Sequence, residues 1–230
     1  MNPDRPRRKI AVLYHLLQEA YGPKPHRLHD PLETLVVTIL SQNTNDVNRD
    51  RAYEELRRRF PAWEEVRDAD PEQVIAAVRV AGLANHKGPH IQTALRAITA
   101  HSGELTLEFL RDMAMDNARR WLMSIDGVGP KTAAIVLCFG FGRPAFPVDT
   151  HVHRVTGRLG LIGPKVGREP AHVLLEALVP GEWCYEFHIN LLEHGRRVCK
   201  APRPLCSRCT LTLHCDYYQA VVIHRGEGSD

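Results

Sequence analysis

Lys131 is the residue whose type and position most suggest covalent chemistry. It opens a helix expected over 131–139 (KTAAIVLCF), directly after the turn DGVGP at 126–130. The positive end of a helix repels a cation and the apolar helix behind it disfavours charge, so we expect a larger neutral fraction than an ordinary lysine has. A neutral lysine amine is a nucleophile that forms Schiff bases with carbonyl carbons. The position therefore indicates a nucleophilic lysine.

The turn before this lysine has the composition of an anion-binding pocket. Gly127 and Gly129 flank one valine, and glycine allows backbone angles that aim successive N–H groups outward at a helix start. It is not a P-loop, because Pro130 stands where that motif needs glycine, and no strand precedes it as a dinucleotide-binding turn requires. The turn suits a phosphate, but a plain connection between two helices explains the two glycines as well, and it is Lys131 after the turn that argues for a site.

Asp149 is the second candidate for catalysis. It lies eighteen residues after the lysine, in the segment PVDTHVHR at 147–154, and is a good N-cap for a helix beginning at Thr150. A cap holds a carboxylate rigidly at a helix start, so capping and catalysis are compatible. His151 and His153 stand two apart on that helix and point in different directions, so we do not expect them to share a metal.

Four of the six cysteines crowd into one segment near the end of the chain. Their spacing is C-x6-C-x2-C-x5-C, at Cys199, Cys206, Cys209 and Cys215. A chain of 230 residues buries enough surface to fold without disulfides, so this density indicates a metal centre. The spacing matches neither a zinc ribbon with two C-x2-C pairs nor the common ferredoxin patterns, and on spacing alone zinc and iron–sulfur both stay open. Cys138 and Cys184 lie in apolar helical runs and are expected to be buried thiols.

Helical periodicity dominates the segments that must position these residues. Apolar side chains recur at helical spacing over 32–40, 74–78 and 91–98, and Asp70-Pro71 is a helix start. No segment shows sustained period-two alternation. We therefore expect an all-α fold of roughly ten helices. Two helical lobes are expected: one helical bundle over 29–142, and a second lobe that joins 1–28 to 143–230.

Hydropathy predicts neither a secreted protein nor a membrane protein. The N-terminal stretch fits an amphipathic helix better than a signal peptide, and no run approaches a membrane span, so a cytoplasmic protein is expected.

Net charge is only +3, but residues 194–215 contain no acidic residue and five basic ones, Arg196, Arg197, Lys200, Arg203 and Arg208. A basic field beside a metal loop suits a polyanion, and a solvated charged surface is the alternative. Residues 224–230 are expected to be disordered.

Three motifs, in this order, resemble those of endonuclease III, in the iron–sulfur branch of the helix-hairpin-helix DNA glycosylases. They are DGVGPKTA at 126–133, VDTH at 148–151 and the four-cysteine loop. The resemblance implies two all-α lobes with DNA in the groove between them, and a 4Fe–4S cluster on the four cysteines. It also implies a bifunctional reaction, in which a damaged base is flipped out, its glycosidic bond is cleaved and the strand is nicked by β-elimination.

The resemblance also assigns roles by position. Lys131 is implied to attack sugar C1′ and hold the Schiff base. Asp149 is implied to deprotonate or orient that amine and to stabilise positive charge on the sugar. Gly127 and Gly129 are implied to offer backbone amides to a phosphate. The implied partner is double-stranded DNA with damaged bases, oxidised pyrimidines by expectation, or with abasic sites; a monomer is expected.

Further DNA contacts are implied for five residues. Gln42 in SQNTND and Leu83 in AGLAN match the family's plugging and wedging positions, which fill the gap left by the flipped base. A polar helix end and a core leucine are the structural alternatives, although the glycine before Leu83 favours its exposure. His151 belongs to the matched VDTH motif. Lys200 and Arg203 lie between the first two cysteines, which suggests that the cluster supports a DNA-contacting loop.

Asp126 departs from the family pattern, in which the hairpin commonly begins Leu-Pro-Gly. An acid at the mouth of a phosphate pocket weakens binding unless it turns inward or caps the next helix. We therefore expect Asp126→Pro to strengthen DNA affinity or leave it unchanged.

Two other functions stay open. A monofunctional mismatch glycosylase of the same fold would lack a nucleophilic lysine at the position of Lys131. A non-catalytic, metal-stabilised DNA-binding module would need the hairpin and the basic loop, but it would not explain Lys131 together with Asp149.

Overall fold

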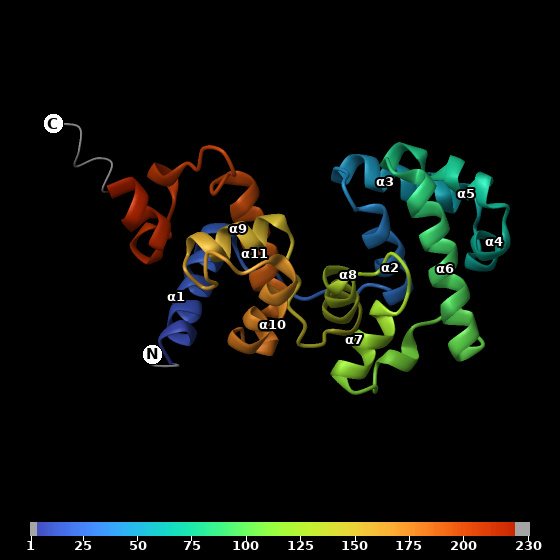
Figure 1. Ribbon diagram of the computed structural model, residues 1–230, viewed down its shortest axis with the longest axis horizontal. Coiled ribbons are helices and arrows are strands. Elements are labelled where there is room, and N and C mark those ends of the chain that lie inside the picture. Colours follow the sequence, from blue (N-terminus) through green and yellow to red (C-terminus); the bar gives the residue numbers. More distant parts are fainter. Residues whose placement is uncertain (1–3, 224–230) are drawn as a thin grey trace. The chain divides into compact units, whose positions relative to one another are not determined.

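The computed structural model describes residues 4–223, which form helices joined by turns, with no strand among them (Figure 1). The α-helices are α1 (Asp4–Tyr21), α2 (Pro31–Leu40), α3 (Asp46–Arg59), α4 (Trp63–Asp68), α5 (Pro71–Ala77), α6 (Ala84–Ser102), α7 (Met115–Met123), α8 (Pro130–Ile135), α9 (Thr150–Arg158), α10 (Arg168–Leu178) and α11 (Cys184–Arg197). Short 3-10 turns are η1 (Arg79–Ala81), η2 (Glu108–Leu110), η4 (Gly181–Trp183), η5 (Cys206–Arg208) and η6 (Thr212–His214), and π-type turns are η3 (Val136–Gly140) and η7 (Tyr218–Ile223). The expected all-α fold is confirmed.

Contacts within the chain divide it into two compact units. The middle unit is Leu28–Phe141, and the terminal unit joins Met1–Arg27 to Gly142–Asp230. The boundaries expected from the sequence fall one residue later at each junction. Within 4–223, no helix is long and apolar enough to cross a lipid bilayer. The disorder expected for 224–230 concerns residues outside the described part of the chain.

The middle unit is built on α2, whose residues are mostly buried. Asp30 caps this helix by accepting a hydrogen bond from the backbone N–H of Glu33 at 2.7 Å, and Pro31 takes the first position. The helix packs against α8 and against the turn η3 that continues α8, and α8 also packs against α7 (Figure 1). Residues 132–134 and 136–138 are buried, which confirms that the helix after the glycine turn is enclosed on most sides.

α6 carries the apolar stripe that packs against α4, α5 and α2. Its predicted stripe residues, Ile91, Ala94, Leu95 and Ile98, are all buried. Two polar side chains of the same helix, Lys87 and Gln92, are buried as well, and both donate hydrogen bonds to backbone carbonyls. The predicted start of α5 is also confirmed, because Asp70 accepts a hydrogen bond from Glu72 N at 2.8 Å.

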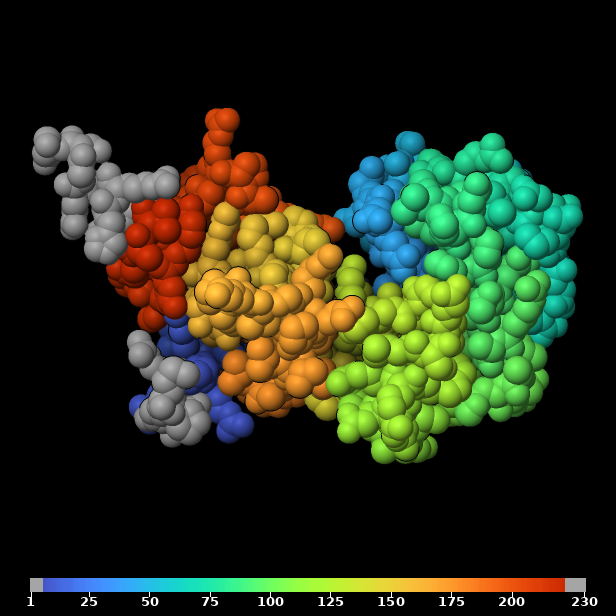
Figure 2. Space-filling model, in the orientation of Figure 1, coloured from blue at the N-terminus to red at the C-terminus, as the bar shows by residue number. Residues whose placement is uncertain are grey.

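In the terminal unit, α1 packs against α10 and α11, and α11 packs against α9. α1 buries Ile10, Leu13 and Leu17, as expected for an amphipathic helix. Its Tyr14 stacks on Trp183 with ring centroids 4.4 Å apart and donates a hydrogen bond to Glu186 at 2.5 Å. The segment after α11, coloured orange to red, lies on the outside of this unit (Figure 2).

Candidate active site and cysteine loop

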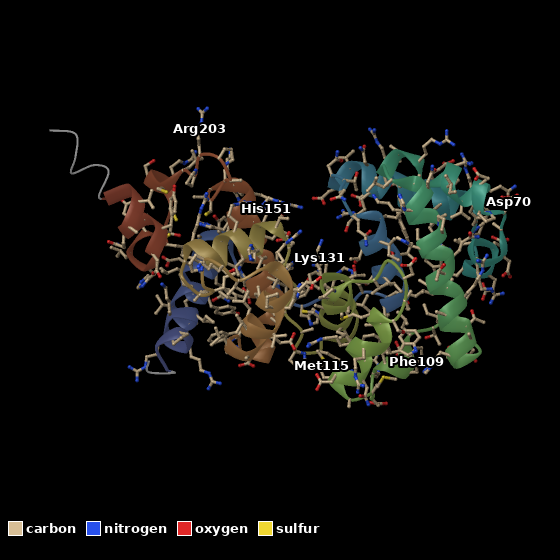
Figure 3. All side chains as sticks on the ribbon, viewed as in Figure 1. Asp70, Phe109, Met115, Lys131, His151 and Arg203 are labelled. Carbon is tan, nitrogen blue, oxygen red and sulfur yellow. The ribbon has the colours of Figure 1, made fainter. Side chains whose placement is uncertain are left out.

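Lys131 lies in the first turn of α8, as the sequence predicted (Figure 3). Pro130 takes the first helical position and Gly129, in an extended conformation, is the N-cap. The lysine side chain is half-buried, and the residues that follow it, 132–134, are buried. The amine is thus carried at the start of a helix whose remainder is fixed in the core of the middle unit.

Gly127 is the residue on which the shape of the hairpin depends. Its φ is +81°, a left-handed conformation that side chains rarely adopt, and a Cβ built there would lie 2.4 Å from the ring of His90. The Gln42 side-chain amide donates a hydrogen bond to the Gly127 carbonyl at 3.0 Å. The turn is therefore held between α6 and the residues that follow α2.

The surface of this turn is hollowed, with walls formed by residues 123–129. A Cβ at Gly129 would meet no atom within 4 Å, so the space that a side chain would occupy at this glycine is open. Asp126 neither turns inward nor caps α8: its side chain is 80% exposed, and its carboxylate lies 3.3 Å from His90 Nε2. The Asp126 carboxylate is therefore placed where it can repel a phosphate, as the prediction requires.

Leu83 is exposed, as predicted from the glycine before it. Its side chain is 51% accessible and its φ is +49°, so this apolar residue is held in a left-handed conformation that costs free energy. A core role for Leu83 is excluded. Gln42 is half-buried near the end of α2, where its hydrogen bond to Gly127 makes it more than a helix-end polar residue.

Asp149 caps α9 as predicted. Its carboxylate accepts a hydrogen bond from Val152 N at 2.7 Å, and the side chain stays partly accessible. Lys131 belongs to the middle unit and Asp149 to the terminal unit.

His151 and His153 have separate partners. The His151 ring lies 3.1 Å from the guanidinium of Arg154, and His153 Nε2 lies 2.8 Å from the Val166 carbonyl. α9 and α11 approach closely at Gly195, where a Cβ would lie only 2.9 Å from His151 Cβ.

All four clustered cysteines line one cavity of the terminal unit. The wall between them is mainly apolar and includes Val155, Leu159, Val198 and Leu205. Leu211 N donates to Cys209 Sγ at 3.4 Å, and the Arg158 guanidinium donates to Cys199 Sγ at 3.3 Å. N–H donors to sulfur in an apolar setting are the surroundings that thiolate ligands of a cluster require. The residues present therefore fit an iron–sulfur group.

Two arginines of α9 fasten the start of the cysteine loop. Arg154 donates to the carbonyls of Cys199 at 3.0 Å and Gly195 at 2.9 Å. Arg158 donates to the carbonyls of Lys200 at 2.7 Å and Ala201 at 2.9 Å. The helix that Asp149 caps is thus bonded directly to the loop that the cysteines form.

The basic residues of this region face solvent. Lys200 and Arg203 are exposed, and the Arg203 side chain extends away from the ribbon (Figure 3). Arg196, Arg197 and Arg208 are exposed too. The two remaining cysteines, Cys138 and Cys184, are buried, as predicted.

Lys87 and His90 of α6 were missed by the sequence reasoning. Lys87 is 1% exposed, and His90 packs beneath Gly127. A signal for Lys87 was available, because it falls four residues before Ile91 on the apolar stripe of α6, where a lysine is unexpected.

Comparison with known proteins places these features in a family. Residues 36–180 match the family model described as HhH-GPD superfamily base excision DNA repair protein. Endonuclease III of Thermotoga maritima is 34% identical over 206 residues, which cover 90% of each chain.

Solved structures share the fold. One of a trapped endonuclease III–DNA covalent intermediate has a TM-score of 0.77 at 26% identity, covering 93% of this chain and 97% of that one. A thermostable thymine-DNA glycosylase has a TM-score of 0.76 at 21% identity, covering 92% of this chain and 97% of that one, so the fold alone does not identify the damaged base. Because the family model spans more than half of the sequence, the chain belongs to the HhH-GPD superfamily of base excision DNA repair proteins.

Proposed function

We propose that this protein is a bifunctional DNA glycosylase and abasic-site lyase that removes oxidised pyrimidines from double-stranded DNA. The observation that carries the proposal is Lys131, an amine held in the first turn of α8 directly after the glycine hairpin. A monofunctional glycosylase of the same fold has no need of an amine there. Endonuclease III relatives, one of them trapped covalently on DNA, support the same choice.

The lysine amine would act as the nucleophile. Its attack on sugar C1′ forms a C–N bond as the glycosidic bond breaks, and the base leaves with the bonding electrons and takes up a proton. Opening of the sugar ring gives a Schiff base. Loss of a C2′ proton then expels the 3′ phosphate by β-elimination, and hydrolysis of the imine by water regenerates Lys131.

Asp149 would supply the negative charge that this chemistry needs. Its carboxylate would orient or deprotonate the amine and stabilise the positive charge that develops on the sugar. The capping bond to Val152 N supports this role, because it removes the rotational freedom of the carboxylate before DNA arrives.

The remaining candidates would bind the DNA. Gly127 and Gly129 would present backbone N–H groups to a phosphate, and His151, Lys200 and Arg203 would contact the strand. Gln42 and Leu83 would fill the gap that a flipped base leaves, because flipping costs a few kcal/mol of lost stacking and pairing. Leu83 is suited to wedging, since it is both apolar and exposed. We expect a monomer that works where chromosomal DNA lies, in the cytoplasm with the nucleoid.

Cys199, Cys206, Cys209 and Cys215 would hold a 4Fe–4S cluster, which supplies a rigid cross-link for the basic loop. Among residues 4–223, no three His, Cys, Asp or Glu side chains converge as ligands of one ion do. Each cysteine of a 4Fe–4S cluster would bind a different iron, so the four thiolates would surround the cluster without meeting at a single ion. Metal analysis decides between the candidates: about four irons per chain and a yellow-brown protein are expected, whereas about one zinc and a colourless protein would exclude the cluster.

Borohydride trapping on duplex DNA with an abasic site tests the enzyme function. The wild-type chain and Lys165→Ala, which removes an exposed lysine outside the proposed site, should both give a covalent adduct. Lys131→Ala should give none, and Asp149→Asn should slow its formation. Nicking that persists undiminished in Lys131→Ala would exclude the proposed nucleophile. Base removal without any trapped adduct in the wild type would favour the monofunctional alternative.

A further inference from the structure

Lys87 is a buried ammonium group that the proposed chemistry does not use. Its side chain is 1% exposed, and its Nζ donates hydrogen bonds to the carbonyls of Leu40 and Ala81, both at 2.8 Å. Burial lowers the pKa of Lys87, because a site away from water disfavours the charged form. An apolar residue of similar length would fill the same space without the cost of burying a charge. What the lysine adds is therefore its two hydrogen bonds to carbonyl groups.

The two carbonyls end two different elements. Leu40 is the last residue of α2, and Ala81 is the last residue of η1. Carbonyls at helix ends lack partners within their helix, and a cation is the group best suited to join two of them. One side chain therefore ties the end of α2 to the end of η1, over 41 positions of sequence.

The last residues of α2 and η1 are each followed closely by a residue that is proposed to fill the gap left by the flipped base. Gln42 follows Leu40 by two positions, and Leu83 follows Ala81 by two. The backbone N–H of Lys87 also donates to the Leu83 carbonyl at 3.0 Å, so the lysine holds the Leu83 loop by its main chain and its side chain. Leu83 stays in its left-handed conformation only because its surroundings impose it, and these bonds are part of those surroundings.

We propose that Lys87 is a positioning residue, which fixes the spacing between Gln42 and Leu83 so that both enter a distorted duplex together. This inference rests on the proposed function, in which those two side chains stabilise the flipped-out state. Lys87 itself contacts neither the sugar nor the base in this scheme.

Lys87→Met tests the proposal by comparing two substrates. In duplex DNA with an abasic site, the sugar must be displaced from the helix, whereas in a single strand it need not be. Because small misplacements of positioning groups cost up to about a hundredfold in rate, we expect duplex nicking to fall by on the order of tenfold to a hundredfold. Single-strand nicking should stay within about twofold. As a second readout, a 2-aminopurine base is placed opposite the abasic site. Its fluorescence should rise less when Lys87→Met binds the duplex than when the wild type binds.

Gln92→Met is the matched control. Gln92 is also 1% exposed on α6, and its amide donates to the carbonyls of Val66 at 3.0 Å and Ala69 at 2.9 Å, which lead to neither loop. Loss of stability from removing a buried hydrogen-bonding side chain should affect Gln92→Met as well. The ratio of its nicking rate on duplex DNA to that on single-stranded DNA should nevertheless match the wild type. Equal duplex-specific losses in both variants would overturn the proposal.

A double-mutant comparison gives the second criterion. In a Gln42→Ala/Leu83→Ala background, Lys87→Met should have little further effect on duplex nicking, because the groups that it positions are gone. A full additional loss would overturn the proposal. Should Lys87→Met fail to fold, Lys87→Gln takes its place under the same criteria, because its amide nitrogen ends one bond nearer the backbone than the lysine Nζ and leaves both carbonyls out of comfortable reach. If the wild type does not nick abasic DNA at all, the proposed lyase fails, while the 2-aminopurine signal still tests Lys87.

Discussion

Gly127→Ala should destabilise the middle unit far more than Gly129→Ala, although both glycines belong to one turn. Gly127 has a φ of +81°, and its added Cβ would lie 2.4 Å from two ring atoms of His90. Gly129 has a φ of −92° and a ψ of −179°, which any residue adopts, and its added Cβ would meet no atom within 4 Å.

The magnitude follows from two separate costs at Gly127. A left-handed conformation costs a non-glycine residue about 1–2 kcal/mol, and forcing a methyl group into a packed site costs about 1–3 kcal/mol. Together they predict a loss of about 2–5 kcal/mol, a large share of the stability of a typical domain. At Gly129, the reduced freedom of the unfolded chain favours alanine by about 0.4–1 kcal/mol. Loss of a glycine N-cap offsets part of that gain, so a change below about 1 kcal/mol is expected.

Urea unfolding followed by tryptophan fluorescence measures both variants. Of the three tryptophans, Trp63 and Trp121 lie in the middle unit and Trp183 in the terminal unit. A Trp183→Phe background therefore makes the signal specific to the unit that carries the hairpin.

His90→Ala supplies the decisive comparison. Removing the ring should restore part of the stability that Gly127→Ala loses, because it abolishes the overlap and leaves the backbone cost. An interaction energy of zero between the two substitutions would show that the ring is not responsible. Equal stability of the two glycine variants would refute the reasoning altogether.

Three further predictions concern other parts of the molecule. Burial raises the pKa of the Cys184 thiol to about 12, so iodoacetamide at pH 8 should leave it unmodified in the native protein, and labelling before unfolding, seen by mass spectrometry, would contradict this. Leu83→Asn, which tolerates a left-handed conformation, should keep or raise stability in the same urea assay while duplex nicking falls; a clear loss of stability would show that Leu83 is not strained. Asp126→Pro should bind duplex DNA as tightly as the wild type or more tightly in a fluorescence anisotropy titration, whereas weaker binding would argue against repulsion of the phosphate by this acid.

Local sequence patterns predicted what depends on neighbours in the chain. The stripe of α2, the caps at Asp70 and Asp149 and the exposure of Leu83 each follow from a few consecutive residues, and the structure confirms them. The roles of Lys131 and Asp149 in catalysis stay predictions.

The remaining features depend on residues distant in sequence. His90 meets Gly127 across 37 positions, and Lys87 reaches Leu40 across 47. No periodicity or capping rule encodes such pairs, because they arise only when the helices pack. The position of Lys87 on an apolar stripe marks it as unusual, but its partners become known only from the fold.

The bonds from Arg154 and Arg158 to the cysteine loop have a consequence for oxidative damage. α9 is a single nine-residue helix about 14 Å long, with Asp149 at one end and Arg158 at the other. A displacement of one end of this rigid helix therefore moves the other end. If the four cysteines hold a cluster, an oxidant that dissolves it would loosen the carbonyls on which both guanidinium groups are anchored. The whole helix, with the capped carboxylate at its far end, would then be free to shift, and if Asp149 has the proposed role, repair would slow although no iron touches the sugar.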